Sequence, residues 1–246
     1  MAELVVYLNE LFEEADKVPL SNHDKMMLVS RGEPWYACSQ HDLEQLFRPS
    51  EDEESDYIRI ILMTAIINTA PDKAGSKASF ISFWDDNIRK IISGIISPST
   101  AIRDSNRNSG TLLQRPDFGF LMGGSCVFRG EEKAPVFSGP HPRHEPPQKP
   151  TGIYDPAPYV LGQYFGVLDP AFVSIVICLG YHAVGASVTL AAISPSGVVD
   201  LTRCDLSSKR QRIKHLIHMI KSCAILQSLH TLIGERGNSE FLPMIR

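Results

Sequence analysis

Two acidic residues and a lysine lie close together near the middle of the sequence, in a segment that alternates as a pair of strands does. The segment runs from Arg115 to Lys133, with Asp117 near its start and Glu131 near its end. Glycines at positions 123 and 124 separate two runs whose apolar residues recur at every second position. This pattern predicts a β-hairpin that carries its charged residues at the open end.

The length of the turn decides which side chains share a face of this hairpin. A two-residue turn would place Asp117 opposite Gly130, whereas a three-residue turn over residues 123–125 would place it opposite Glu131. The three-residue turn also collects the apolar side chains on one face, which would hold Phe118, Phe120, Met122, Cys126 and Phe128. The other face would then hold Asp117, Arg129, Glu131 and Lys133. Because the apolar residues share a face only in this register, the sequence favours the three-residue turn.

Two carboxylates held opposite each other on paired strands repel unless a cation lies between them. Magnesium suits this position because it takes a few carboxylate oxygens and keeps its other positions for water and phosphate. Lys133, two residues beyond Glu131, could reach the attacking water or the scissile phosphate. We therefore expect Asp117 and Glu131 to bind magnesium or manganese, and Lys133 to be the third catalytic residue.

Pro116-Asp117 followed by Glu131-x-Lys133 resembles the PD-(D/E)xK pattern of restriction-enzyme-like nucleases. More specifically, the sequence is similar to the nuclease-like domain of Crinkler-type effectors of fungi and oomycetes. The segments that carry this likeness are residues 79–88, 115–119, 128–133 and 184–190. The resemblance implies metal-dependent hydrolysis of nucleic acid, with DNA as the expected substrate. It also implies a fourth acid from the preceding helix, for which Asp85 and Asp86 are both candidates.

The resemblance implies a kinase domain next to this one in a longer protein, and the chain itself contains a kinase-like triplet. Asp117-Phe118-Gly119 matches the metal-binding triplet of protein kinases. However, Ser109 stands where a kinase needs an asparagine, and no glycine-rich GxGxxG loop precedes it. The chain itself is therefore not predicted to be a kinase. The alternative to a nuclease is a nuclease-derived domain without turnover that binds a protein partner or regulates an adjacent kinase.

The net charge of -4 means that any positive surface for nucleic acid must be concentrated on one face. A basic run opens the last predicted helix and contains Lys209, Arg210, Arg212 and Lys214, followed by His215, His218 and Lys221. With Arg129, this run is expected to contact phosphates. A solvated basic helix face accounts for the same pattern, so both interpretations stay open.

Apolar periodicity predicts the elements that must position these residues. Helices are expected over residues 2–17, 41–47, 56–69, 79–97 and 207–233, and strands over 118–132, 172–179, 187–193 and 198–203. The expected fold is α/β (α+β), a mixed sheet flanked by helices. We expect a helical N-terminal extension over residues 1–78 and the nuclease-like domain over 79–246, with a proline-rich loop at 134–158.

The remaining composition bears on location and partners. The sequence has five scattered cysteines and no CxxC pair, which is typical of free thiols in a reducing compartment. It shows no signal peptide and no apolar run long enough to cross a membrane. We expect an intracellular protein without a membrane partner, nuclear in a host cell if it is an effector. A homodimer is left open.

Overall fold

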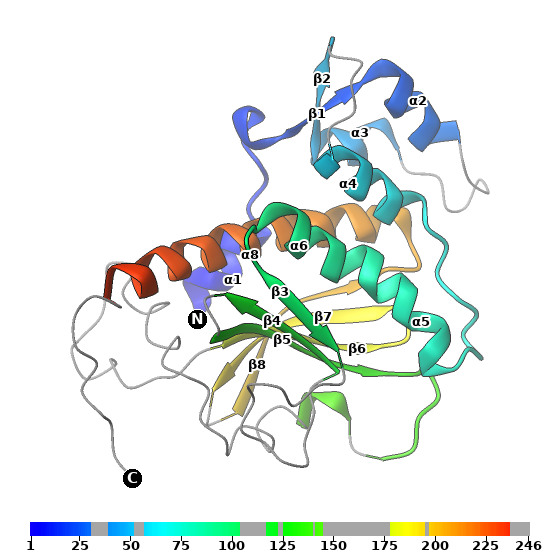
Figure 1. Cartoon of the computed structure of the whole chain (residues 1–246). Coiled ribbons are helices and arrows are strands. Elements are labelled where there is room, and N and C mark those ends of the chain that lie inside the picture. The colour runs from blue at the N-terminus through cyan, green and yellow to red at the C-terminus, as the bar shows by residue number, and fades with distance from the viewer. Residues whose placement is uncertain are drawn as a thin grey trace.

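The computed structural model describes residues 1–30, 39–51, 57–103, 117–122, 125–139, 141–144, 178–194 and 197–236. Within them the centre is a six-stranded sheet in the order β3-β4-β5-β6-β7-β8 (Figure 1). The strands are β3 (Thr100–Arg103), β4 (Phe118–Met122), β5 (Ser125–Lys133), β6 (Cys178–Val184), β7 (Ser187–Ser194) and β8 (Gly197–Asp205). Only β5 and β6 run parallel to each other. The predicted mixed α+β sheet flanked by helices is confirmed.

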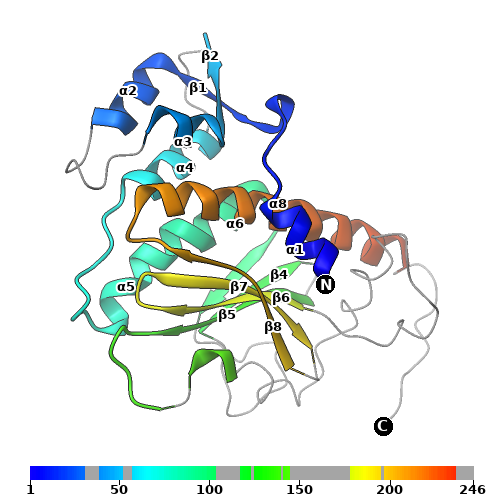
Figure 2. The same ribbon diagram turned by 180° about the vertical axis from the view of Figure 1, so that it is seen from behind.

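Helices cover one face of this sheet (Figures 1 and 2). They are α5 (Lys77–Trp84), the π-helical turn η3 (Asp85–Arg89), α6 (Lys90–Ile95) and the long α8 (Lys209–Arg236). The helix predicted over 79–97 is therefore present but begins earlier: its N-cap is Ser76, not Ser79. The wide turn η3 follows from an inserted residue in the helical ladder, and it shifts the side chains that follow relative to a regular helix.

The N-terminal segment contains more than helices. Its elements are α1 (Ala2–Asn9), η1 (Glu14–Asp16), β1 (Val18–Ser21), α2 (Asn22–Ser30), α3 (Gln40–Glu44), β2 (Phe47–Ser50) and α4 (Tyr57–Ile67). The helix predicted over 2–17 ends at Asn9, and the parallel pair of β1 and β2 was not predicted. α1 packs against β8 and α8, and α4 packs against α6 and α8. The boundary at residue 78 stays a prediction.

The hairpin of β4 and β5 has the predicted register but a different turn. Phe118 pairs with Gly130, which puts position 117 level with 131, as expected. The predicted three-residue turn is wrong, because Met122 pairs with Ser125 and only residues 123 and 124 connect the strands. A bulge beside Phe120 and Leu121 supplies the extra residue instead. As a consequence Cys126 pairs with Leu121, on the face opposite Phe118 and Phe128.

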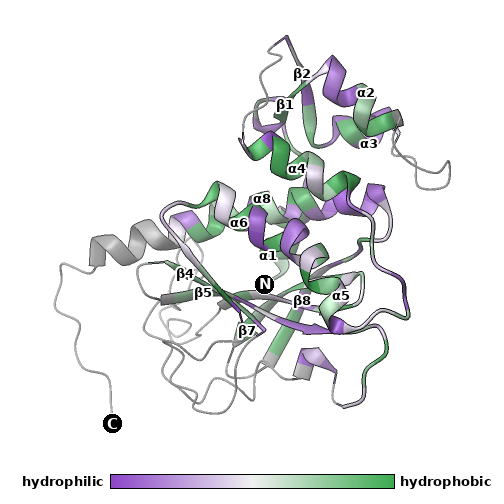
Figure 3. Cartoon of the chain, turned by 45° about the vertical axis from the view of Figure 1, so that its right-hand side comes forward, coloured by the Kyte–Doolittle hydropathy of each residue, from purple (hydrophilic) through white to green (hydrophobic). Residues whose placement is uncertain are grey.

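The apolar face of the sheet forms the core with the helices. Phe118, Phe128 and Tyr181 contact one another with ring centroids 5.8 to 6.4 Å apart. Trp84 is fully buried and its indole Nε1 donates to the Gly185 carbonyl at 2.8 Å. Figure 3 shows stretches of apolar residues on β4, β5, α4 and α6. These contacts fix α5 against the ends of β5 and β6.

The C-terminal elements match the predictions, apart from the end of the last helix and a short turn in the proline-rich segment. The strands predicted over 187–193 and 198–203 are present as the antiparallel pair β7 and β8, and α8 follows them and continues past residue 233 to Arg236. The strand expected over 172–179 is described only from 178, where β6 begins. The proline-rich segment, described at 134–139 and 141–144, contains a short 3-10 turn, η4 (Pro142–His144). No helix in the described ranges is long and apolar enough to cross a membrane.

Candidate functional site

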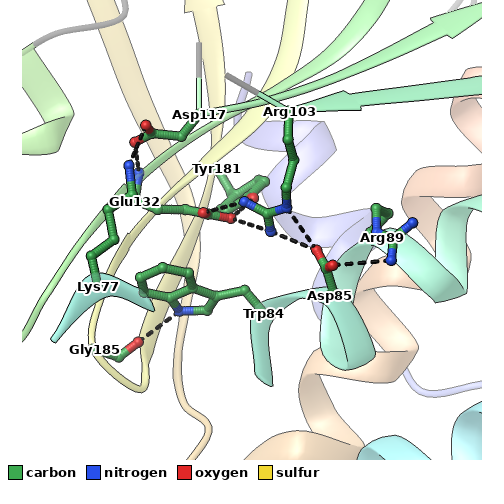
Figure 4. A network of polar contacts seen from close by, with 9 residues as sticks. All are labelled: Lys77, Trp84, Asp85, Arg89, Arg103, Asp117, Glu132, Tyr181 and Gly185. Carbon is green, nitrogen blue, oxygen red and sulfur yellow. Dashed lines mark hydrogen bonds and ion pairs between the residues drawn. The ribbon is translucent and has the colours of Figure 1, made fainter. Parts of the chain in front are cut away.

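Asp117 lies immediately before β4 and binds the neighbouring strand directly. Its Oδ2 accepts a hydrogen bond from the backbone N–H of Glu132 at 2.7 Å. Its Oδ1 accepts from the ammonium group of Lys77, the first residue of α5 (Figure 4). The Asp117 side chain is only 12% exposed. The hairpin therefore holds this aspartate against the Glu131–Lys133 segment, beside the start of α5.

Glu132 forms the centre of a buried polar network. Its carboxylate receives two hydrogen bonds from the Arg103 guanidinium, at 2.6 and 3.0 Å. The Tyr181 hydroxyl donates to the same carboxylate at 2.5 Å. Arg103 also donates to Asp85 at 2.9 and 2.5 Å, so one guanidinium spans two carboxylates (Figure 4). A planar fork with five donors is suited to this bridging role.

The network depends on a close approach of β5 and β6. A Cβ atom at Gly130 would lie 2.1 Å from the Tyr181 ring, far inside contact distance. Glycine at 130 therefore lets the ring lie across the strand and reach Glu132 with its hydroxyl. Arg103 lies 5.9 Å over the Phe118 ring, which holds the guanidinium from the other side.

Burial and charge shift the acidity of these groups. Burial raises the pKa of Glu132 above its ordinary value, although the hydrogen bond from Arg103 opposes the shift. Burial raises the pKa of Tyr181 well above its usual range, and the charge of Glu132 adds to the effect. Burial alone would lower the pKa of Arg103, but the hydrogen bond and charge of Glu132 outweigh it and raise that pKa. Arg103 therefore stays charged throughout.

Glu131 points to the face of the sheet opposite Glu132, because successive strand residues alternate. Its Oε1 accepts from the guanidinium of Arg129 at 3.0 Å, and both side chains are buried. Lys133, the last residue of β5, is half-buried, and its carbonyl accepts from Gly185 N–H at 2.9 Å. Thus Lys77 binds Asp117 while Arg129 binds Glu131. Convergence of Asp117, Glu131 and Lys133 on one ion stays a prediction.

The two candidates for the fourth acid have different surroundings. Asp85 faces the sheet, where it binds Arg103, and its other oxygen binds Arg89 at 3.0 Å. Asp86 faces away from Glu132 and binds Lys90 at 2.5 Å and the side-chain amide of Asn68. The structure therefore joins Asp85, and not Asp86, to the hairpin network.

The basic residues of α8 do not form one surface. Lys209 and Arg212 are buried, and Arg212 donates to the carbonyls of Ala65 and Asn68 near the end of α4. Arg210 is exposed and binds Asp42 at 3.2 Å, while Lys214 is exposed. The later members are also buried: His215, His218 and Lys221. The interpretation of the whole run as one phosphate-binding face is therefore wrong, because five of its seven side chains are buried.

The oxygen donors beside the hairpin suit magnesium in chemistry, since all of them are carboxylates. In this arrangement protein cations already neutralise them: Lys77 at Asp117, Arg103 at Glu132 and Arg129 at Glu131. Across the described residues, no three histidine, cysteine or acidic side chains are grouped so as to hold a metal ion. A metal ion that binds Asp117 would therefore have to displace the Lys77 ammonium from the Asp117 carboxylate.

Sequence reasoning missed Lys77, Arg103 and Tyr181. Nothing in their spacing relates them to the hairpin, because Arg103 lies on β3, which the apolar pattern did not predict, and Tyr181 lies on β6, beyond the end of the strand expected over 172–179. The alternation along β5 places Glu132 on the same face as Phe128. This alternation was the sequence signal that could have identified Glu132 as a member of the network.

Fold and site together define a mixed α+β domain with an acidic hairpin end neutralised by basic side chains. The chain is similar to "Crinkler effector protein 8" of Phytophthora infestans, with 33% identity over 120 residues. These residues are 48% of this chain and only 20% of that relative. No protein-family profile and no solved structure matches the chain. The chain therefore resembles Crinkler-type effectors over about half of its length.

Proposed function

We propose that this chain is a nuclease-like effector domain of the PD-(D/E)xK class, which hydrolyses phosphodiester bonds of nucleic acid, with DNA as substrate. The observation that carries the proposal is the hydrogen bond from Glu132 N–H to Asp117, which holds the aspartate against the Glu131–Lys133 segment. The likeness to a Crinkler effector supports the effector part of the proposal.

Asp117 and Glu131 would hold magnesium or manganese, and Lys133 would hold positive charge at the attacked phosphate. A bound divalent ion would supply an activated water and would neutralise charge on the phosphate. Lys133 is the last residue of β5 and is half-buried, so its side chain would have access to a substrate at this end of the strand. Asp85 would be a positioning residue, since it holds Arg103 on Glu132.

A second function is favoured by the ion pairs themselves. Each acid of the hairpin already has a basic partner within the protein, as expected of a nuclease-derived domain without turnover. Such a domain would bind a protein partner or regulate an adjacent kinase domain. The adjacent kinase, a homodimer and a nuclear location in a host cell are likewise proposals.

A cleavage assay tests the first function. Plasmid and oligonucleotide substrates, DNA and RNA, would be incubated with magnesium or manganese and with wild type, Lys133→Ala or Lys25→Ala. Lys25 lies in the N-terminal part on a surface pair with Glu44 and is the control. We expect cleavage by wild type and Lys25→Ala and a loss of at least about 100-fold in Lys133→Ala. Equal residual cleavage in all three would indicate a contaminant, and no cleavage by wild type would contradict the nuclease.

Lys77→Met separates the two functions. Removal of the ammonium leaves Asp117 without its protein cation, so a metal-binding aspartate should then bind magnesium more tightly than in wild type. A domain without a metal site should only lose stability, with no response to magnesium. Metal titrations followed by calorimetry would measure the difference.

A further inference from the structure

A cavity of about 840 Å³ lies where the β6–β7 turn, the end of β8 and the start of α8 meet. Its volume is in the range of small-ligand sites, about 300 to 1,000 Å³. Four basic side chains line it, namely Lys73, Arg203, Lys209 and Arg212, against two acidic ones, Asp72 and Asp205. The lining therefore carries an excess of positive charge in a protein whose net charge is -4.

Each of the two acidic side chains of the lining accepts a hydrogen bond from a backbone N–H of its own turn. Asp72 Oδ1 accepts from Ala74 N–H at 2.7 Å, and Asp205 Oδ1 accepts from Ser207 N–H at 3.1 Å. Among the described residues, neither Lys73 nor Arg203 has an acidic partner, and Arg203 uses only its Nε, on Ser187 Oγ at 3.0 Å. The cavity therefore presents positive charge that an anion could neutralise.

The remaining lining adds two complementary features. Lys209 and Arg212 lie in the first turn of the 28-residue α8 and Ser207 lies just before it, where the helix dipole favours an anion. The lining also contains apolar residues, among them Ile67, Pro71 and Pro135. A ligand with a phosphate at one end and a flat apolar group at the other matches both parts.

The cavity also adjoins the hairpin site. Phe80 of α5 lines it, three residues from Lys77, which binds Asp117. Pro135 and Gly185 line it as well, and Gly185 N–H donates to the carbonyl of Lys133. A ligand in the cavity would therefore lie next to the end of β5.

We propose that this cavity binds a nucleotide 5′-phosphate, with the phosphate held by Arg203 and Lys73 and the base against the apolar lining residues. That the natural ligand comes from nucleic acid rests on the proposed function. A free nucleotide and the phosphorylated end of a nucleic acid share this chemistry. Binding itself needs neither metal nor cleavage.

Isothermal titration in EDTA tests the site with adenosine 5′-monophosphate, adenosine and inorganic phosphate. We expect the monophosphate to bind and adenosine to bind at least about tenfold more weakly, because it lacks the anion. Arg203→Ala and Lys73→Ala, both at exposed positions, should each weaken the monophosphate about tenfold or more. Arg210→Ala is the control, since Arg210 lies next to Lys209 of the lining but does not line the cavity itself and binds Asp42.

Binding of a trinucleotide with and without a 5′-phosphate distinguishes the two sources of the ligand. Tighter binding of the phosphorylated trinucleotide than of the mononucleotide assigns the cavity to a nucleic-acid end, and weaker binding assigns it to the free nucleotide. No binding of the monophosphate at millimolar concentration would overturn the proposal, as would equal losses in Arg203→Ala and Arg210→Ala. Nucleotide binding without any cleavage activity would contradict only the nuclease.

Discussion

Glu131 and Glu132 are neighbours on β5, yet they meet different partners on opposite faces of the sheet. Glu131 binds Arg129, two residues away on the same strand. Glu132 binds Arg103 from β3 and Tyr181 from β6, and through Arg103 it is joined to Asp85 of η3. One glutamate therefore has a local partner, while the other links three separate parts of the chain. The comparison teaches that the residue matching a motif and the residue on which the fold depends can be adjacent and distinct.

The largest expected effect tests the close approach beneath Glu132. Gly130→Ala would put a Cβ 2.1 Å from the Tyr181 ring, which Phe128 and Phe118 hold in place. We expect a loss of at least about 4 kcal/mol in the free energy of unfolding, or no folding at all. Gly94→Ala is the control, since the atom nearest to its Cβ would be the flexible end of the Ile61 side chain, at 2.7 Å, with the Tyr57 ring at ordinary contact distance. Urea melts of both variants would measure this, and a mild effect at 130 would contradict the packing described.

The next effect tests the bridge between the two carboxylates. Arg103→Ala leaves the buried Glu132 and Asp85 without their shared cation, so we expect a loss of about 3 kcal/mol. Arg89→Ala removes the other partner of Asp85, a side chain 39% exposed, and should cost less than about 1 kcal/mol. Chemical denaturation of the Arg103→Ala and Arg89→Ala variants would measure the two losses in the free energy of unfolding. Similar losses in both variants would mean that Arg103 is an ordinary surface arginine.

Two conservative substitutions distinguish the proposed ligand Glu131 from Glu132, the centre of the buried polar network. Glu131→Gln and Glu132→Gln should each lose about 1–2 kcal/mol, because each weakens a charged hydrogen bond to an arginine. Only Glu131→Gln should lose metal-dependent cleavage, since Glu131 is the proposed ligand. Cleavage rates and melts measured on the same preparations would test this. Cleavage lost in Glu132→Gln and kept in Glu131→Gln would transfer the ligand role to Glu132.

The smallest effect concerns pH. Because burial raises the pKa of Glu132 in the folded state, protonated Glu132 favours folding, and that contribution is lost as pH rises from 4.5 through the raised value. Glu132→Gln removes this titration. The unfolding free energy of the variant minus that of wild type should therefore increase with pH across this window, as measured by urea melts. A difference that decreases would mean that Arg103 dominates and lowers the pKa.

The sequence predicted the parts of the fold that apolar periodicity controls. The register of Phe118 with Gly130 followed from the alternation of aromatic residues, and α4, β7, β8 and α8 followed from similar patterns. The predicted length of the turn was wrong, because a bulge in the strand gives the same register as one extra residue in the turn. The partners of Glu132 could not be predicted, since they come from strands distant in sequence. The basic run of α8 was misread because charge alone does not show which side of a helix is buried.

The central claim is that Asp117 is a metal ligand, and thermal melts in magnesium test it most directly. A ligand that binds only the folded state stabilises it, by about 1.4 kcal/mol at ten times its dissociation constant. We predict a magnesium-dependent rise in melting temperature for wild type and for Asp86→Asn, whose aspartate also binds a lysine but lies away from the hairpin. Asp117→Asn should show no rise. An equal rise in all three proteins, or none in wild type, would contradict the account.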